Sequence, residues 1–357
     1  MKKSVTMTAV AQKSGVSVST VSLALRNMPG IPSETRRSVL EAAKELGYRL
    51  SSGAPYRLSS LALIVKADAD LPPNINPFYS HVMAGVENSC WQKKITLLYA
   101  SLPVDDENCA VEIPHLLREQ DVDGYLIVGA LINGALEECL KDKDTPVILV
   151  DSYDPARRYD SVLSANFCGA YQAVRHLIRM GHQSIGCVGG SEIAYPSIRE
   201  RRQGYLRALA DHGLKAPYLA GTKTLKSSES YSAVLEMLTR YPEVSAIFGC
   251  NDELSFSVFR AAQALGRKIP GDLSVIGFDN VETARHVTPG LTTMHVDKVS
   301  MGRLAVRALA ERLEAPEMER ITISIHPRLV ERESAAPVNR TEGERNIGML
   351  SRGGDTL

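Results

Sequence analysis

A helix-turn-helix pattern within the first fifty residues constrains this chain more than any other feature. An amphipathic segment carrying Met7, Val10 and Ala11 on its apolar side ends at Gly15, and a second helical segment follows directly. Two helices joined by a tight turn that contains glycine predict a helix-turn-helix motif. The second helix of such a motif enters the DNA major groove by its N-terminal turn, which here carries small side chains. These are Ser17, Val18, Ser19 and Thr20.

Polar caps and glycine stops predict a compact three-helix head over residues 1–48. Thr6 and Ser17 precede the first two helices and are favourable N-cap residues. A third helix is predicted after Pro32, and Gly47 ends it. Its apolar residues recur at helical spacing, so they are expected to form one core with the first two helices. The predicted core is Val10, Val21, Leu25, Val39, Ala42, Ala43 and Leu46.

Basic residues are concentrated in this head. Residues 1–60 contain nine Lys and Arg against three Glu, a net charge of +6, whereas the whole chain of 357 residues has a net charge of zero. A basic head on an acidic body predicts a polyanionic partner for the head alone. Arg36 and Arg37 are the expected phosphate contacts. A small helical bundle without a nucleic-acid partner is the alternative, and it leaves the agreement of charge, turn and caps unexplained.

Composition and residue spacing argue against several other classes of protein. The chain is 44% apolar and 23% charged, as is typical of a globular protein, and it contains no apolar run long enough for a membrane span. No apolar segment follows the N-terminal lysines, so no secretory signal is predicted. The six cysteines are scattered, which predicts neither a metal site nor a disulfide framework and suits a reducing cytoplasm.

Residues 61–336 are predicted to form an α/β body. Short apolar runs alternate with helical patterns, which indicates βαβ units and parallel sheets with helices on both faces. The predicted strands are Leu61–Lys66, Ile95–Ala100, Gly124–Val128, Val147–Asp151, Ser184–Gly189, Ser245–Gly249 and Leu273–Phe278. The predicted helices include Tyr79–Gln92, Cys168–Met180, Glu200–His212, Tyr231–Thr239 and Glu253–Leu265.

Polar and aromatic residues follow several of these strands, where ligands of open parallel sheets bind. They comprise two carboxylates, an amide, a guanidinium and aromatic rings, a set that suits a sugar or another small polyol, although purines are held by similar groups. The residues are Asp151, Asp279, Asn251, Arg201, Phe78, Tyr79 and Tyr195. Structural roles are the alternative: Asn251 as the N-cap of the helix from Glu253, and the carboxylates as loop caps. No glycine-rich phosphate loop follows any strand, no nucleophile motif is present, and neither a cofactor nor catalysis is predicted.

The head resembles that of the LacI/GalR family of bacterial repressors. The resemblance rests on residues 6–22 (TMTAVAQKSGVSVSTVS), Thr35-Arg36 and Leu46-Gly47-Tyr48. It implies that Val18, Ser19 and Leu23 face operator bases. Leu23 stands where a polar base reader is often found, which implies apolar contact with a thymine methyl group. The full set of DNA-binding residues expected on this basis is Thr6, Ser17, Val18, Ser19, Thr20, Ser22, Leu23, Asn27, Arg36 and Leu58.

Residues 49–60 form the expected hinge or linker. Members of this family place a short helix here that ends in a leucine wedged into the minor groove, and such wedges bend the duplex. Leu58 or Leu50 would be that wedge in this chain. Gly53 and Pro55 both oppose a helix, so a flexible linker is the alternative.

The body resembles the effector core of the same family, which is similar to periplasmic sugar-binding proteins. The matching motifs include Asn76-Pro77-Phe78-Tyr79, Arg201-Arg202-Gln203-Gly204-Tyr205 and Val275-Ile276-Gly277-Phe278-Asp279, and the resemblance covers roughly residues 4–334. It implies two lobes with a pocket between them. The effector-binding residues expected from the resemblance and the strand ends together are Phe78, Asp151, Ser197, Arg201, Asn251 and Asp279.

Two expectations concern assembly. Residues 337–357 are polar and lack a leucine heptad, so we expect a disordered tail and no tetramerising coiled coil. A small head makes few base contacts, and specific affinity requires two heads on a palindromic operator. A homodimer is therefore predicted, paired through residues 67–90 and the second lobe.

These features together predict a cytoplasmic transcriptional regulator that is not an enzyme. Its affinity for double-stranded DNA would be controlled by a small ligand, a sugar by preference, bound between the lobes, with no membrane partner. The alternative is a stand-alone sugar-binding protein or carbohydrate enzyme in which the basic head is incidental.

Overall fold

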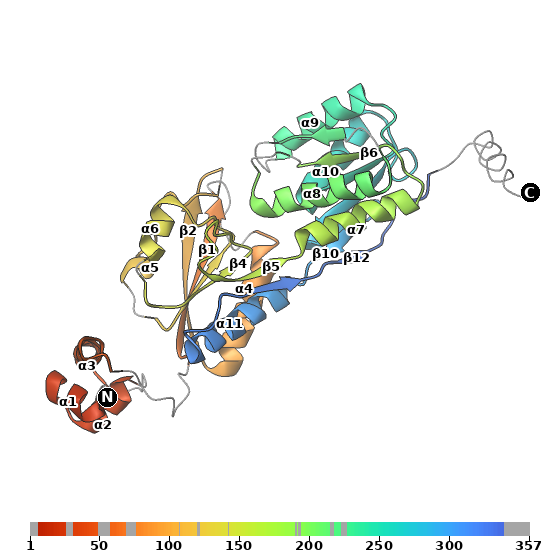
Figure 1. Ribbon diagram of the computed structural model, residues 1–357. Helices are drawn as coiled ribbons and strands as arrows, with labels where there is room; N and C mark the ends of the chain where they lie inside the picture. The colour runs from red at the N-terminus through yellow and green to blue at the C-terminus, as the bar shows by residue number, and fades with distance from the viewer. Residues whose placement is uncertain are drawn as a thin grey trace, which may run out of the picture.

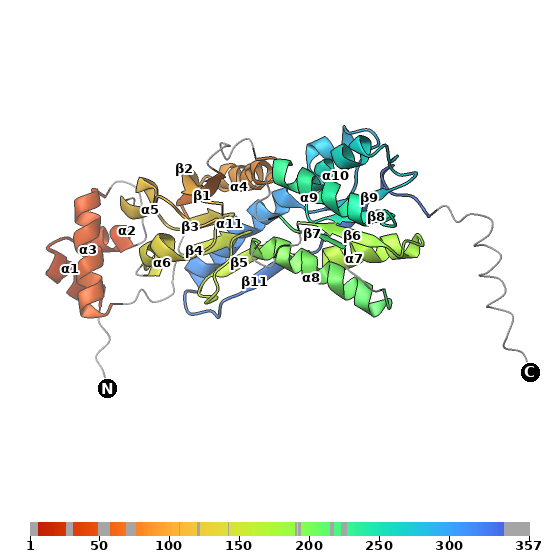
Figure 2. The ribbon, with the colours of Figure 1, turned by 90° about the horizontal axis from the view of Figure 1, so that it is seen from above.

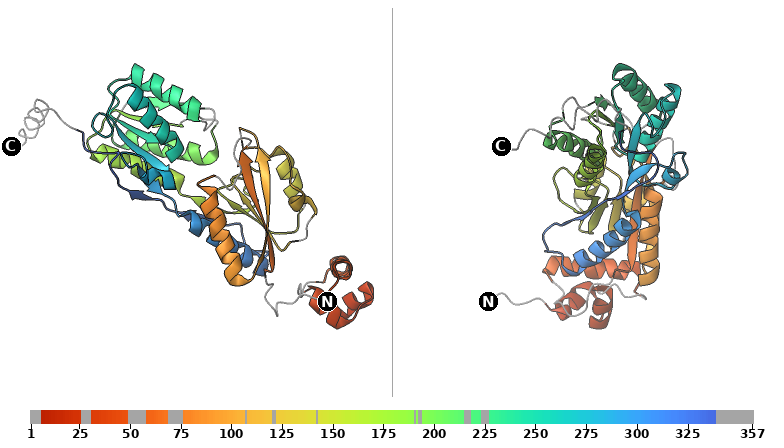
Figure 3. Two further views of the ribbon diagram at one scale, coloured as in Figure 1. Left: turned by 180° about the vertical axis from the view of Figure 1, so that it is seen from behind. Right: turned by 90° about the vertical axis from the view of Figure 1, so that its right-hand side faces the viewer.

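The structure is a computed structural model. It describes residues 6–25, 31–48, 58–68, 76–106, 108–119, 122–141, 143–189, 191, 194–214, 218–222 and 227–338. A small helical head lies at the end of an elongated body that is made of two lobes (Figures 1 and 2). The head is next to the first lobe and away from the second, as the view from behind in Figure 3 also shows.

The head consists of α1 (Met7–Ser14), α2 (Val18–Leu25) and α3 (Ser33–Leu46). The predicted caps are confirmed: the Thr6 side chain accepts a hydrogen bond from the Ala9 N–H, and Ser17 Oγ accepts one from the Thr20 N–H at 3.0 Å. Gly47 ends α3 in the left-handed region with φ 67°. The predicted head core is confirmed as well, with Leu46 partly buried against it. Its buried members are Val10, Ala11, Val21, Ala24, Leu25, Val39, Ala42 and Ala43.

The first lobe is a parallel six-stranded sheet in the order β11-β5-β4-β3-β1-β2. Alternate residues of β1 supply two cores, because side chains of a strand point to opposite faces. Leu61 and Leu63 pack on the side of α4 and α11, whereas Ala62 and Ile64 pack on the side of α5 and α6. These helices cover the two faces of the sheet (Figure 3). The strands are β1 (Ser60–Asp68), β2 (Thr96–Val104), β3 (Tyr125–Val128), β4 (Val147–Val150), β5 (Asp160–Ser164) and β11 (Thr322–Ile325). The helices are α4 (Tyr79–Lys93), α5 (His115–Glu119), α6 (Gly134–Lys141) and α11 (Lys298–Glu314).

The second lobe is a six-stranded sheet in the order β12-β10-β9-β8-β6-β7. Its described strand pairs are parallel except β10 with β12, which is antiparallel. The strands are β6 (Ile185–Val188), β7 (Tyr218–Ala220), β8 (Ala246–Gly249), β9 (Ser274–Asp279), β10 (Thr292–His295) and β12 (Arg328–Val330). The helices are α7 (Asn166–Arg179), α8 (Pro196–Asp211), α9 (Ser227–Arg240), α10 (Asp252–Ala264) and the 3₁₀ turn η1 (Glu282–Arg285).

Within the described residues the chain crosses between the lobes three times. The crossings lie between β5 and α7, between β10 and α11, and between β11 and β12 (Figure 1). Each lobe is therefore built from separate stretches of sequence. A buried ion pair fastens the returning helix α11 to the first lobe, since Arg312 Nε and Nη2 lie 2.7 and 2.8 Å from the two carboxylate oxygens of Asp160.

The α/β fold with parallel-sheet lobes is confirmed, and each predicted strand and helix is present with ends shifted by a few residues. The prediction missed several elements. Most of them are short and either contain polar residues or lie at sheet edges, whereas α11 is a helix of 17 residues. The missed elements are β5, β7, β10, β11, β12, α5, α6 and α11. None of the described helices is both long and apolar enough to cross a membrane.

The body is slightly longer than the predicted range of 61–336. Leu58 is buried in the core of the first lobe with 6% of its surface exposed, and β1 begins at Ser60. At the other end the Val338 N–H donates a hydrogen bond to the Met180 carbonyl. The remainder of the expected linker (residues 49–57) and of the expected tail (residues 339–357) lies outside the described residues.

Candidate ligand site and nucleic-acid interface

Polar side chains from both lobes meet where the strands of the two sheets end, and we call this region the inter-lobe site. The first lobe contributes Asp151, which directly follows β4, and the second contributes Asp279 at the end of β9. Arg201 from α8 contacts Asp279 and interacts electrostatically with Asp151, and all three residues are buried. The structure thus brings together three of the six residues predicted to bind an effector.

Arg201 is held by partners on three sides. Its Nη2 lies 3.0 Å from Asp279 Oδ1, its Nε donates to Asn166 Oδ1 at 2.9 Å, and its Nη1 donates to the Cys250 carbonyl at 2.7 Å. The guanidinium carbon lies 3.9 Å from the centre of the Phe278 ring. A buried guanidinium with fixed partners has a defined orientation, so it can present its charge to a ligand without reorganising.

Asp151 binds two tyrosines, one from each lobe. Tyr79 of α4 donates its hydroxyl to Asp151 Oδ2 at 3.0 Å, and Tyr195 from the second lobe donates to the Asp151 carbonyl oxygen at 2.8 Å. The other carboxylate oxygen, Oδ1, is buried and has no hydrogen-bond partner among the described residues. A buried acceptor without a donor is unfavourable by about 1–3 kcal/mol. The inter-lobe site therefore offers an acceptor that a ligand O–H or N–H group would satisfy.

Backbone strain is concentrated at the same strand ends. Asp151, Asp279 and Asn280 have φ values of 47°, 106° and 51°, in the left-handed region that favours glycine. Residues held in such conformations are unfavourable by about 1–3 kcal/mol each and cluster at ligand sites.

Burial alters the acidity of the site. Burial raises the pKa of Asp151 to about 6, and the Arg201 charge opposes this shift. Burial also raises the pKa of Asp279, again opposed by Arg201. The pKa of Asp252 is raised to about 7 by burial and by the neighbouring Asp279. Hydrogen-bond donors of a ligand would favour the ionised carboxylates.

Lys298, the first residue of α11, binds the backbone of the strained turn at Asp279 and Asn280. Its ammonium is buried and donates to the Asp279 carbonyl, and it lies 3.3 Å from the carbonyls of Asn280 and Val296. Burial lowers the pKa of Lys298, and the carboxylates of Asp279 and Asp252 oppose this shift. This side chain links the returning helix of the first lobe to the strand end of the second.

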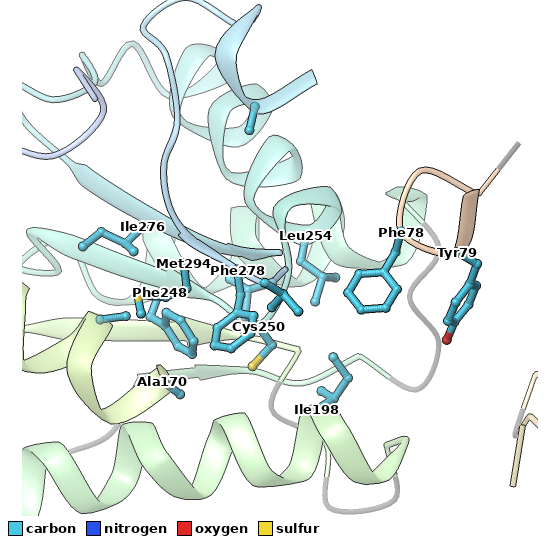
Figure 4. Packing of buried hydrophobic residues seen from close by; sticks show 14 of the residues in the cluster. Phe78, Tyr79, Ala170, Ile198, Phe248, Cys250, Leu254, Ile276, Phe278 and Met294 are labelled. Atoms are coloured by element: carbon cyan, nitrogen blue, oxygen red, sulfur yellow. The ribbon is translucent and has the colours of Figure 1, made fainter. Parts of the chain in front are cut away.

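The remaining predicted effector residues differ in their surroundings. Phe78 is buried just before α4 and reaches from the first lobe toward Leu254 of the second (Figure 4). Ser197 is buried in the first turn of α8. Asn251 is the N-cap of α10, and its Oδ1 accepts the Leu254 N–H at 2.8 Å. The predicted N-cap role of Asn251 is confirmed, and its role toward an effector stays a prediction.

Several residues of the inter-lobe site were not predicted. Asn166 binds Arg201 and also donates to Tyr153 and Glu200, at 3.1 and 3.0 Å. Both Asn166 and Lys298 follow strands that the sequence pattern did not reveal, β5 and β10. The rule that ligand residues follow strand ends would have found them if those strands had been recognised.

The exposed face of α2 carries the predicted base-reading side chains. Val18 and Leu23 are 42% and 40% exposed, and Ser17 and Ser19 are exposed beside them. Thr20 and Ser22 are half-buried, and Asn27 lies outside the described residues. Arg36 is half-buried, and its Nη1 donates to the Ala24 carbonyl at 3.4 Å, so it also ties α3 to α2.

The predicted minor-groove wedge is wrong for Leu58 in this conformation. Its side chain packs in the first-lobe core, so insertion between DNA bases would first require it to leave that core. Leu50, the other candidate, lies outside the described residues.

Comparison with known proteins agrees with this architecture. Residues 6–51 match the family model of bacterial regulatory proteins of the lacI family, and residues 174–335 match that of the periplasmic binding protein-like domain. The HTH-type transcriptional repressor PurR of Aliivibrio salmonicida is 31% identical over 333 residues, which cover 91% of this chain and 97% of the relative.

Two solved structures have the same fold. The transcriptional regulator CelR in complex with cellobiose has a TM-score of 0.67 and 26% identity, and the match covers 93% of this chain and all of that one. A LacI family transcriptional regulator from Enterococcus faecium with bound ribose has a TM-score of 0.65 and 28% identity, over 78% of this chain and all of that one.

The helix-turn-helix head and the two-lobed body together define a DNA-binding transcriptional regulator with a ligand-binding domain. This chain belongs to the LacI family of bacterial regulatory proteins.

Proposed function

We propose that this protein is a repressor whose affinity for a specific operator is controlled by a sugar bound at the inter-lobe site. The observation that carries the ligand assignment is the buried Oδ1 of Asp151, which has no hydrogen-bond partner in the part of the chain that the structure describes and which feels the charge of the Arg201 guanidinium. Sugars present several hydroxyl donors together with an apolar ring face, which suits carboxylates next to an aromatic residue such as Phe78. The bound ribose and cellobiose in two structures of this fold support the choice.

We propose that the head reads DNA through α2. In this proposal Val18, Ser19 and Leu23 contact base edges, while the hydroxyls of Thr6, Ser17, Thr20 and Ser22 and the Arg36 side chain contact the backbone. Asn27 would add a further contact between the head and the DNA. Since one head makes few base contacts, the proposal includes a homodimer on a palindromic operator.

Ligand class is tested by calorimetry and thermal melting of the full-length protein. Ribose, cellobiose and other mono- and disaccharides would be compared with adenine, guanine and hypoxanthine. We expect at least one sugar to raise the melting temperature and to bind Asp151→Asn at least tenfold more weakly. Binding of a nucleobase and of no sugar would contradict the sugar assignment.

Operator recognition is tested with duplexes that the wild-type protein enriches from a random library. Affinity should fall steeply with salt, since phosphate neutralisation releases counterions. Val18→Ala should change the ranking of the enriched sequences. Leu40→Ala, which removes an exposed apolar side chain from α3 instead, should leave that ranking unchanged. A uniform loss of affinity in Val18→Ala would mean that Val18 does not read bases.

A further inference from the structure

The junction between the head connector and the first lobe is built around one carboxylate. Asp123 is buried two residues before β3, and its Oδ2 lies within hydrogen-bond distance of four donors. The N–H and hydroxyl of Ser59 donate to it at 2.7 Å each, and those of Ser60 donate at 2.8 and 3.2 Å. Hydrogen bonds to a charged acceptor are the stronger class, so this is a firm attachment.

Other contacts fix the same short segment. The Leu58 side chain is buried in the first-lobe core. The Ser59 carbonyl accepts the Thr96 N–H at 2.8 Å, and the Ser60 carbonyl accepts the Asp123 N–H at 3.1 Å. Residues 58–60 are therefore a fixed part of the body, and the connector joins the lobe at this point. We call Asp123 with Ser59 and Ser60 the anchor.

The anchor and the inter-lobe site lie at opposite ends of the same two strands. β1 starts at the anchor and carries Lys66 near its other end, where the ammonium lies 2.6 Å from Asn108 Oδ1 and 5.9 Å from the Tyr195 ring centre. β3 starts two residues after Asp123 and leads to Gly129, where an added Cβ would lie 2.6 Å from the Tyr79 ring. With a rise of about 3.3 Å per residue, β1 spans about 20 Å between the two places.

We propose that Asp123 is a positioning residue that fixes the end of the connector to the first lobe, so that displacement of this lobe is passed to the DNA-binding head. A hydrogen-bonded strand transmits displacement along its length, whereas an unfastened connector would absorb it. The effect on DNA binding rests on the function proposed above. The attachment of residues 58–60 to the first lobe does not depend on that function.

Proteolysis of the full-length protein measures the attachment. Trypsin cleaves after Arg57, and a protease requires the residues that follow its cleavage site in an extended, accessible form. We expect Asp123→Asn to be cut after Arg57 at least tenfold faster than the wild type. The double variant Ser59→Ala/Ser60→Ala, which keeps the carboxylate and the backbone donors, should be cut severalfold faster.

Asp272→Asn is the matched control. Asp272 in the second lobe also accepts a backbone N–H, that of Lys268 at 2.8 Å, but it lies far along the chain from the connector. The Asp272→Asn variant should be cut after Arg57 at the wild-type rate. An unchanged rate in a folded Asp123→Asn variant overturns the proposal. If that variant does not fold, an unchanged rate in the double serine variant overturns it.

DNA binding measures the consequence. On a duplex enriched by the wild-type protein, Asp123→Asn should bind at least tenfold more weakly, and Asp272→Asn within twofold of the wild type. Asp123→Asn should also discriminate less against the same duplex with one base pair inserted at its centre. Wild-type affinity and discrimination in Asp123→Asn overturn the positioning role. If the wild type enriches no duplex, the function proposed above is overturned, and the cleavage rates alone decide whether the anchor holds.

Discussion

At the scale of single residues, Arg201 organises part of the inter-lobe site, because it is buried and binds Asp279, Asn166 and the Cys250 carbonyl. Arg201→Met would leave Asp279 and the Cys250 carbonyl without their donor. Removal of one partner from a buried ion pair typically destabilises a protein by about 3–5 kcal/mol. Arg201→Met/Asp279→Asn removes the uncompensated charge, so we expect it to be more stable than Arg201→Met alone.

Urea unfolding followed by circular dichroism checks this prediction. If the free-energy losses of the two single variants simply add in the double variant, Arg201 and Asp279 are not energetically coupled and the ion pair is unimportant.

Asp151 should make stability depend on pH. Its pKa is about 6 in the folded protein and about 3.9 in an unfolded chain, so the folded state binds the proton more tightly. The resulting stabilisation is fully present below about pH 4 and is lost as the pH rises through about 6. Asp151→Asn lacks this titration.

The measurement is the free energy of unfolding of the wild type minus that of Asp151→Asn, from pH 4 to pH 8. We expect the difference to fall by about 3 kcal/mol over this range. The difference is used because Asp252 and Asp279 titrate in both proteins. A difference independent of pH would show that burial does not raise this pKa.

Residue roles could be predicted from the sequence only where a strand end was recognised. Asp151 and Asp279 follow apolar strands that are evident in the sequence, and both lie in the site. Asn166 was missed because the strand before it, with the sequence DSVLS, alternates polar and apolar residues weakly. Asn251 lies both at a strand end and at a helix start, so the sequence predicts a ligand contact and a capping role alike.

At the scale of elements, the close packing of α4 against α11 depends on two glycines. A Cβ added to Gly302 would lie 2.2 Å from the Val82 carbonyl oxygen, and one added to Gly85 would lie 2.1 Å from the Val299 carbonyl oxygen. Both obstacles are backbone atoms, so side-chain rotation cannot relieve them. The two helices also form the core under β1, which carries the anchor.

Gly302→Ala should therefore destabilise the protein by about 1–3 kcal/mol, although alanine favours helices. Gly221→Ala is the control, since an added Cβ meets nothing within 4 Å there. Thermal melting should separate the two variants by several degrees. Equal melting temperatures would show that the helices can move apart freely.

Element prediction succeeded where burial on both faces makes a strand continuously apolar, as in VILV of β4 and AIFG of β8. It failed at sheet edges, where β11 has the sequence TISI and exposed residues alternate with half-buried ones. It also failed for Leu58, because an apolar residue in a connector has the same pattern whether it packs on the body or on DNA.

At the scale of the whole molecule, the three crossings decide how the lobes can move. α11 belongs to the first lobe by its packing, yet Lys298 at its start binds the strand end of the second lobe. The sequence could not show this arrangement, since strand order depends on contacts between residues more than a hundred positions apart, as between β5 and β11. A ligand that binds one arrangement of the lobes more tightly would shift the population toward it.

The boundary of the body leads to a prediction about fragments. A fragment of residues 58–338 keeps the Leu58 side chain in the core and all four donors of Asp123. A fragment of residues 61–338 loses both, which leaves Asp123 buried without these donors. Burial of a leucine stabilises by about 2–3 kcal/mol, and an unsatisfied buried carboxylate adds to the loss.

We therefore expect the shorter fragment to unfold at a clearly lower urea concentration, while both fragments lose DNA binding with the head. Leu58→Ala in the longer fragment separates the two contributions, because it removes the apolar burial and keeps the hydrogen bonds of the anchor. If the two fragments have the same unfolding midpoint, residues 58–60 are not part of the folded body, and the body begins at residue 61 as the sequence pattern predicts.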